Sequence, residues 1–217
     1  MNDRAAKVAE FLLKIQAVKL SPSQPFTWAS GMKSPIYCDN RVILSYPDIR
    51  KEICKAFHEL VKAEYPDANA VAGVATAGIA HGILLAEAMN VPFVYVRSSP
   101  KAHGLNNQVE GRIEPGQKYI VVEDLVSTGG SSLQAALALK AAGTEIAGLV
   151  SIFQYGFPKA LELFKDNGIR YSSLSNLESL LQKAGEISYI QPVEMDLVLA
   201  WKKDPQAWSE AMISKGN

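Results

Sequence analysis

The sequence predicts an α/β fold, with a doubly wound, mostly parallel sheet flanked by helices. Two observations predict it. From residue 70 onward, short apolar runs alternate with helical segments rich in Ala and Leu, which is typical of parallel strands joined by crossover helices. The runs Ala70–Val74 and Tyr119–Val122 are apolar, as expected for buried strands, and each stops at a short polar or glycine-containing loop.

The N-terminal part is predicted to contain two helices and a hairpin. Apolar residues at helical spacing mark one face of the first helix: Val8, Phe11, Leu12 and Ile15. Residues 26–39 are typical of two short strands around the turn at Ser30 and Gly31. A long helix follows and ends at Pro66, and its apolar stripe consists of Ile49, Ile53, Phe57, Leu60 and Val61.

Strands and helices alternate through the centre of the chain. The predicted strands cover residues 70–74, 91–96, 119–122 and 145–153, and a short fifth strand is expected at 169–172. The predicted helices cover residues 79–89, the segment from about 131 to Gly143, and 158–167. Gly143 is expected to end its helix, because glycine readily adopts the left-handed conformation found there.

The C-terminal part is predicted to be mostly helical. Ser175 and Glu178 have the spacing of a capping box in front of an apolar helical pattern. Pro192 and Pro205 suit the first turns of the last two helices, the second of which Asp204 would cap.

We expect the whole chain, residues 1–217, to form a single domain of ordinary size. Its core would span about 45–173. The N-terminal hairpin and the C-terminal helices, about 1–42 and 174–217, would form a small hood over the carboxyl edge of the sheet.

The composition favours a cytoplasmic protein. The chain has 22 basic and 22 acidic residues, so no overall field attracts nucleic acid or an anionic membrane surface. No apolar run reaches membrane-spanning length, and the first dozen residues differ from a signal peptide. Cys38 and Cys54 lack the spacing of metal ligands and are expected to be small buried thiols. Neither nucleic acid nor a membrane is therefore an expected partner.

The stretch from Val121 to Ser132 carries the clearest chemistry. An apolar strand stops at Glu123 and Asp124, and hydroxyls and a glycine pair then precede a helix. The free N–H groups of a helix N-terminus bind anions, and glycine lets the backbone approach a ligand closely. Because carboxylates repel phosphate, the pair of acids fits a ligand that also has hydroxyls or a metal ion, such as a sugar phosphate. The alternative is an acidic strand end before an ordinary capped helix.

Two other loops leave the same edge of the predicted sheet. The turn Ala75–Gly78 could present N–H groups to a diphosphate, or it is a plain strand–helix turn. The polar segment Arg97–Gly116 contains Arg97, Lys101 and His103, which makes it a candidate mobile lid that binds anions. His103 could donate a proton or hydrogen bond to a leaving group. The alternative for this segment is a solvated loop with incidental charges.

The stretch 121–132 resembles the signature with which type I phosphoribosyltransferases bind phosphoribosyl diphosphate (PRPP). That signature has apolar residues, two acids, two more apolar residues and then Thr/Ser-x-Gly-x-Ser/Thr. Together with the basic loop, it makes the chain similar to the orotate phosphoribosyltransferase family over nearly its whole length. The segments that carry the similarity are 26–41, 72–82, 95–111, 121–131 and 150–158.

The resemblance implies a type I phosphoribosyltransferase-like fold and a reaction: orotate and PRPP give orotidine 5′-monophosphate and diphosphate, with Mg²⁺ as cofactor. The catalytic residues it implies are Arg97, Lys101, His103 and Asp124. The further residues it implies for PRPP binding are Glu123, Leu125, Val126, Ser127, Thr128, Gly129, Gly130 and Ser131. Ser127 would also meet orotate, and no protein cage for Mg²⁺ is expected, because substrate phosphates hold the ion. The resemblance further implies a homodimer in which the basic loop acts in trans.

The chain departs from the family pattern at four positions. Many members have lysines at Ala29 and Ala77, an arginine near Gln154 and a basic residue at Ser98. Two rival functions stay open at this point. One is a PRPP-dependent transferase for another base, and the other is a PRPP-sensing regulator without catalysis.

Overall fold

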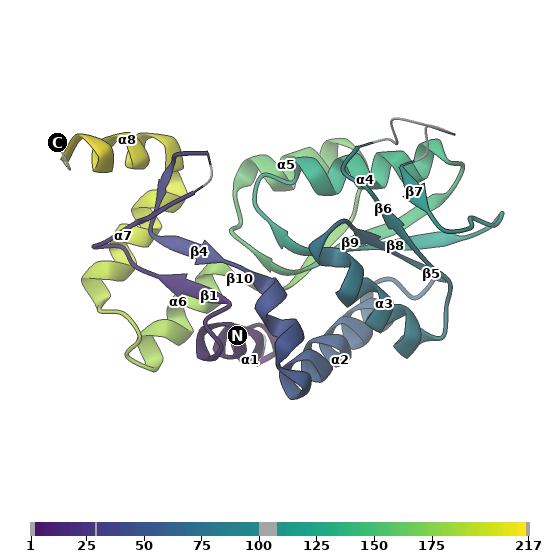
Figure 1. Cartoon of the computed structure of the whole chain (residues 1–217), viewed down its shortest axis with the longest axis horizontal. Coiled ribbons are helices and arrows are strands. Elements are labelled where there is room, and N and C mark those ends of the chain that lie inside the picture. Colours follow the sequence, from purple (N-terminus) through teal and green to yellow (C-terminus); the bar gives the residue numbers. More distant parts are fainter. Residues whose placement is uncertain (1–2, 29, 100–107, 216–217) are drawn as a thin grey trace.

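The structure is a computed structural model that describes residues 3–28, 30–99 and 108–215. Its centre is a six-stranded sheet with the order β10-β9-β8-β5-β6-β7 (Figure 1). All neighbours are parallel except β6 and β7, which are antiparallel. The strands are β5 (Ala70–Val74), β6 (Phe93–Val96), β7 (Val109–Glu110), β8 (Lys118–Val126), β9 (Glu145–Gln154) and β10 (Tyr171–Asn176). The predicted mostly parallel sheet is confirmed.

Helices cover both faces of this sheet, which makes it doubly wound. One face packs against α2 (Pro47–Glu64) and α3 (Ala77–Met89), and the other against α4 (Gly130–Ala141) and α5 (Pro158–Asp166), as Figure 1 shows. The two apolar cores match these faces: Phe57 of α2 belongs to the first and Leu133 of α4 to the second. Within the described ranges, no helix is both long enough and apolar enough to cross a membrane.

The two ends of the chain meet beside the sheet. The N-terminal elements are α1 (Asp3–Lys14), β1 (Val18–Leu20), β2 (Phe26–Thr27), β3 (Lys33–Ser34), β4 (Ile36–Cys38) and the 3₁₀-helix η1 (Asn40–Ser45). The C-terminal elements are α6 (Leu177–Glu186), α7 (Pro192–Lys203) and α8 (Pro205–Lys215). The hairpin predicted over 26–39 is shorter in the structure: β2 and β3 form it over residues 26–34, whereas β4 pairs with β1. The Lys33 N–H of this hairpin donates to Ser209 Oγ of α8 at 2.8 Å. The division into a core and a hood stays a prediction.

Several predicted boundaries differ from the structure. β8 continues to Val126 instead of ending at Val122, because β9 runs beside it as far as Gln154. The fifth strand covers 171–176 instead of 169–172. The strand β7, inside the segment 97–116, was not predicted.

The capping box predicted at Ser175 and Glu178 is wrong. The side chain of Asn176 caps α6 by accepting from the Ser179 N–H at 2.9 Å, whereas Ser175 is buried and donates to the Ala5 carbonyl. The chain has its capping box at the start of α7 instead, between Gln191 and Glu194. The predictions for the last two helices are confirmed: each starts at its proline, and Asp204 accepts from the Ala207 N–H.

Candidate active site

The two acids lie near the carboxyl end of β8, at the edge of the sheet where α4 begins. Glu123 is only 6% exposed, and its carboxylate accepts from Ser132 Oγ and from the Asp124 N–H, both at 3.1 Å. Asp124 is partly exposed, because its side chain points to the opposite face of the strand. Of the pair, Asp124 is therefore the one that offers a carboxylate to a ligand from outside.

Burial changes the acidity of both groups. It raises the pKa of Glu123 to about 8, with the charge of Asp124 as the second cause. Burial also raises the pKa of Asp124, while a hydrogen bond with Glu123 and the charge of Arg41 lower it. The pair therefore resists carrying two negative charges at once, as expected of adjacent carboxylates with little water around them.

The loop after the acids leads directly into the N-terminus of α4. Gly129 has φ +79°, and no side chain of the described residues caps the first N–H groups of the helix. Thr128, Gly130 and Ser131 are exposed, and Ser127 is partly exposed. Free N–H groups, hydroxyls and the positive end of the helix dipole therefore lie together, an arrangement that suits an anion such as a phosphate.

The turn Ala75–Gly78 packs directly against β8 beside these acids. A Cβ atom built on Gly78 would lie 2.4 Å from the carbonyl oxygen of Val122, so only glycine allows this approach. The Ala75 N–H donates to the carbonyl of Val96, and the Ala75–Thr76 peptide bond is cis. The turn Ala75–Gly78 and the loop that begins at Glu123 are thus neighbours at the carboxyl edge of the sheet, as predicted.

Arg97 directly follows β6 at this edge. Its N–H donates to the Gln108 carbonyl at 2.9 Å, and its Nη1 lies 3.6 Å from Glu110 Oε1 of β7. The side chain of Arg97 is 35% exposed, which leaves part of the guanidinium open to a ligand. Lys101 and His103, the other predicted residues of this loop, lie outside the described residues.

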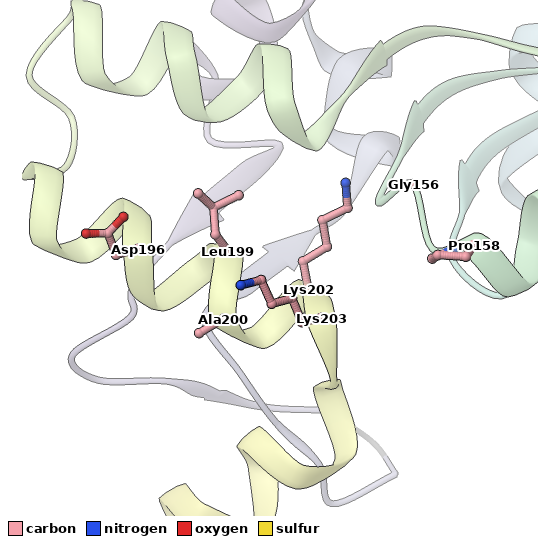
Figure 2. Close-up of a pocket in the computed structure, with 7 residues that line it drawn as sticks. All are labelled: Gly156, Pro158, Asp196, Leu199, Ala200, Lys202 and Lys203. Carbon is pink, nitrogen blue, oxygen red and sulfur yellow. The ribbon is translucent and has the colours of Figure 1, made fainter.

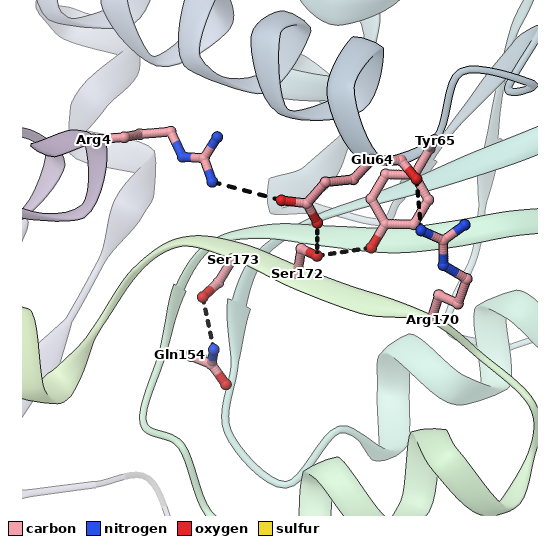
Figure 3. Close-up of polar contacts among 7 residues, drawn as sticks. All are labelled: Arg4, Glu64, Tyr65, Gln154, Arg170, Ser172 and Ser173. Carbon is pink, nitrogen blue, oxygen red and sulfur yellow. Dashed lines mark hydrogen bonds and ion pairs between the residues drawn. The ribbon is translucent and has the colours of Figure 1, made fainter. Parts of the chain in front are cut away.

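Aromatic rings connect the N-terminal hairpin to the end of β9. Trp28 stacks on Tyr155, with centroids 6.1 Å apart, and Trp201 of α7 meets both rings edge-on. Gln154 lies near the position at which the resemblance described above leads us to expect an arginine. It donates from Nε2 to Ser173 Oγ at 2.7 Å (Figure 3). Lys33 Nζ donates to Thr27 Oγ1 within the hairpin at 2.9 Å.

A groove of about 720 Å³ lies between α7 and the loop after β9 (Figure 2). It is lined by Gly156, Pro158, Asp196, Leu199, Ala200, Lys202 and Lys203. Lys202 points toward Gly156 and forms an ion pair with Glu178. The groove contains none of the predicted site residues, and the sequence alone did not indicate it.

No group of three or more His, Cys, Asp or Glu side chains that could hold a metal ion occurs among the described residues. Cys38 and Cys54 are free thiols, and both are partly buried.

Comparison with known proteins identifies the family. Residues 42–173 match the model of the phosphoribosyl transferase domain. Orotate phosphoribosyltransferase of Streptococcus pneumoniae serotype 19F is 51% identical over 206 residues, which cover 95% of this chain and 98% of that protein. The enzyme of that name from Lactococcus lactis subsp. cremoris strain SK11 is 50% identical over 93% of this chain and 96% of its own length. The chain belongs to the orotate phosphoribosyltransferase family.

Solved structures of orotate phosphoribosyltransferases have the same fold. The Aeropyrum pernix structure is 30% identical, with a TM-score of 0.73 over 82% of this chain and 98% of that one. The Mycobacterium tuberculosis structure, solved in complex with PRPP, is 25% identical, with a TM-score of 0.65 over 82% and 98%. The type I phosphoribosyltransferase fold is therefore confirmed, and the chain is a transferase.

Proposed function

We propose that this chain transfers the 5-phosphoribosyl group of PRPP to orotate, in pyrimidine synthesis, at the carboxyl edge formed by β5, β6 and β8. The observation that supports this site most strongly is the pairing of a partly exposed Asp124 with the N-terminus of α4, which begins six residues later at Gly130 and has no side-chain cap among the described residues. A ribose phosphate has the matching groups, with hydroxyls at one end and a phosphate at the other.

Each residue of this edge has a role in the proposal. Asp124 accepts hydrogen bonds from the ribose 2- and 3-hydroxyls. For Glu123 to contact the same hydroxyls, as the family resemblance implies, its carboxyl must turn away from Ser132 and the Asp124 N–H when PRPP binds. The residues from Leu125 to Ser131 seat the 5-phosphate on their N–H groups and hydroxyls, and Ser127 also meets orotate. The turn Ala75–Gly78 faces the diphosphate.

The charges that develop when the bond to diphosphate breaks decide which residues assist this step. Cleavage of the bond between C1 and the diphosphate oxygen leaves positive charge on the ribose ring and negative charge on the leaving group. Arg97 and Lys101 stabilise the diphosphate, and His103 donates a hydrogen bond or proton to it. Asp124 lies where its negative charge favours the cationic ring.

The donor set fits Mg²⁺ that is held largely by the substrate. Mg²⁺ prefers oxygen ligands and keeps several waters, so it needs few protein ligands. Asp124 is the partly exposed carboxylate that could face the ion, since Glu123 is engaged with Ser132 and the backbone. Mg²⁺ bound with the diphosphate would neutralise charge on the leaving group.

Assembly and location complete the proposal. We propose a homodimer in which Lys101 and His103 of one subunit serve the site of the other, in the cytoplasm. The family resemblance supports the dimer, and the balanced composition supports the location.

The test incubates the protein with PRPP and Mg²⁺ and follows the loss of orotate by its ultraviolet absorbance. Parallel reactions offer hypoxanthine, adenine or uracil as the acceptor in place of orotate. We expect orotate alone to be consumed. Asp124→Asn should lower kcat about a hundredfold or more, as the loss of one electrostatic contact to a transition state does elsewhere. The exposed Asp166→Asn is the matched control and should retain native activity. Consumption of another base in place of orotate would refute the proposal.

A further inference from the structure

Asn40 is a fully buried polar residue that contacts the main chain of the active site. It is the first residue of η1, separated from the end of β4 by one residue, and its Nδ2 donates to the carbonyl oxygen of Asp124 at 2.8 Å. β5 pairs with β8 only as far as Val122, so β8 has no strand neighbour on this side at Asp124. The Asn40 amide therefore supplies the hydrogen bond that a longer β5 would have made.

The same peptide unit also faces the Asp124 carboxylate. Its N–H, on Leu125, lowers the pKa of this carboxylate against the effect of burial. The carbonyl on the other side of that peptide bond is the acceptor for Asn40. A tilt of the peptide plane would therefore move the carboxylate with it, because one rigid group carries both contacts.

Asn40 lies between elements from both ends of the site. Its backbone is beside the imidazole of His81, a buried residue of α3, and partly offsets the lowering of the His81 pKa that burial causes. Asn40 also lies beside the thiol of Cys38 on β4 and opposes the rise in the thiol pKa that burial causes. Its side-chain oxygen Oδ1 has no hydrogen-bond partner among the described residues, so the hydrogen bond from Nδ2 to Asp124 is the contact that orients the amide. Asn40 therefore lies where β4, α3 and the end of β8 come together.

We infer that Asn40 is a positioning residue, which fixes the peptide plane after Asp124 and so aims this carboxylate at the bound sugar. The inference rests on the proposed function, since it assigns Asn40 an effect on the binding of PRPP. Asn40 does not touch the substrate. Its removal would leave the Asp124 carbonyl buried without a partner, and the strand end would relax to find one.

The experiment compares Asn40→Ala and Asn40→Asp with a matched control. Asn167 also donates from Nδ2 to a backbone carbonyl at 2.8 Å, that of Leu163, but at the end of α5. PRPP affinity is measured by calorimetry without orotate, and kcat, both KM values and Tm are measured beside it. Asn40→Ala should raise the Kd of PRPP about tenfold, as loss of one buried hydrogen bond predicts, and lower kcat. The KM of orotate should change much less.

The aspartate variant and the controls make the test specific. Asn40→Asp should lose more PRPP affinity than Asn40→Ala, because an aspartate carboxylate would face the carbonyl oxygen of Asp124 with no proton to donate. Asn167→Ala should lower Tm and leave PRPP affinity native. If Asn40→Ala does not fold, Asn40→Ser is measured instead, with the same expectation.

Native PRPP affinity and native kinetics in a folded Asn40 variant would overturn the inference. A drop in the Tm of the Asn40 variant, with the KM values of PRPP and orotate raised by the same factor, would also overturn it. That result would indicate a general loss of stability and not a local effect on Asp124. Failure of the native chain to consume orotate would refute the proposed function instead. PRPP calorimetry would then still decide the role of Asn40.

Discussion

At the scale of single residues, the unusual group of this site is Glu123, a carboxyl buried beside another carboxyl. Its pKa of about 8 lies well above the ordinary 4.5 because burial disfavours the charged form. The unfolded chain loses this proton near pH 4.5, but the folded chain keeps it until about pH 8. The folded state therefore binds more protons in this window, and Glu123 lowers the stability progressively as the pH rises through it.

Glu123→Gln should remove this dependence. The variant should gain about 1 kcal/mol or more relative to native protein between pH 5 and pH 8, since one pKa unit corresponds to about 1.4 kcal/mol. In Tm this gain is roughly 2–4 °C for a chain of this size. Thermal unfolding at several pH values measures it, with the exposed Glu162→Gln as control. A difference in Tm that stays constant with pH would contradict the assignment.

The sequence predicted the chemistry of this site better than its geometry. The order of acids, hydroxyls and glycines indicated which residues meet at the sheet edge, because strand, turn and helix cap each depend on a few neighbouring residues. It did not indicate that Glu123 is buried against Ser132, since burial depends on α4 folding back over β8. Asn40 was missed for the same reason: it lies 84 positions from its partner Asp124.

At the scale of elements, strand ends were the hardest features to predict. β8 extends through Glu123 and Asp124, two residues that disfavour strands, because β9 offers it hydrogen bonds there. β10 contains three serines and little apolar pattern, yet it pairs with β9 along its length. Ser175 matched a capping box by spacing, but its hydroxyl is bonded to Ala5 on α1. Tertiary partners decided each of these cases.

The contact between α2 and β9 allows a direct test of packing. The ring of Tyr65, at the end of α2, lies so close to Gly148 that an added Cβ would be 2.1 Å from Cε1. The ring cannot move away easily, since Tyr65 OH is 2.9 Å from Ser172 Oγ and the guanidinium of Arg170 lies over its face at 4.7 Å (Figure 3). Gly148 therefore leaves the space that this ring fills.

Gly148→Ala should destabilise the protein by roughly 1–3 kcal/mol, the usual cost of overpacking. Urea unfolding measures the change, and Gly130→Ala is the control because, outside its own helical turn, no described part of the chain lies within 4 Å of a Cβ built there. Adding Tyr65→Leu to Gly148→Ala should cost less than the sum of the two single changes, since the clash is then absent. Additive costs would show that the ring is not the obstacle.

At the scale of the whole molecule, the fold brings the turn after β5, Arg97 after β6 and the loop after β8 to one edge of the sheet. In the proposed function, the turn supplies N–H groups, Arg97 supplies a cation, and the loop after β8 supplies carboxylates and a helix N-terminus. Open parallel sheets bind ligands at this edge because their strands end there together. Glu110 holds the guanidinium of Arg97 near the base of its segment, while Lys101 and His103 are proposed to serve the partner's site.

Mixed dimers test this sharing of loops. Lys101→Ala and Asp124→Asn dimers should each be nearly inactive and keep the native Tm. In a heterodimer of the two, one site has Lys101 from the Asp124→Asn subunit and Asp124 from the other, so it is complete. A heterodimer purified with two different tags should therefore recover about half of the native activity per dimer, as expected for one intact site of two. If each chain used its own loop, every site would lack one residue and no activity would return.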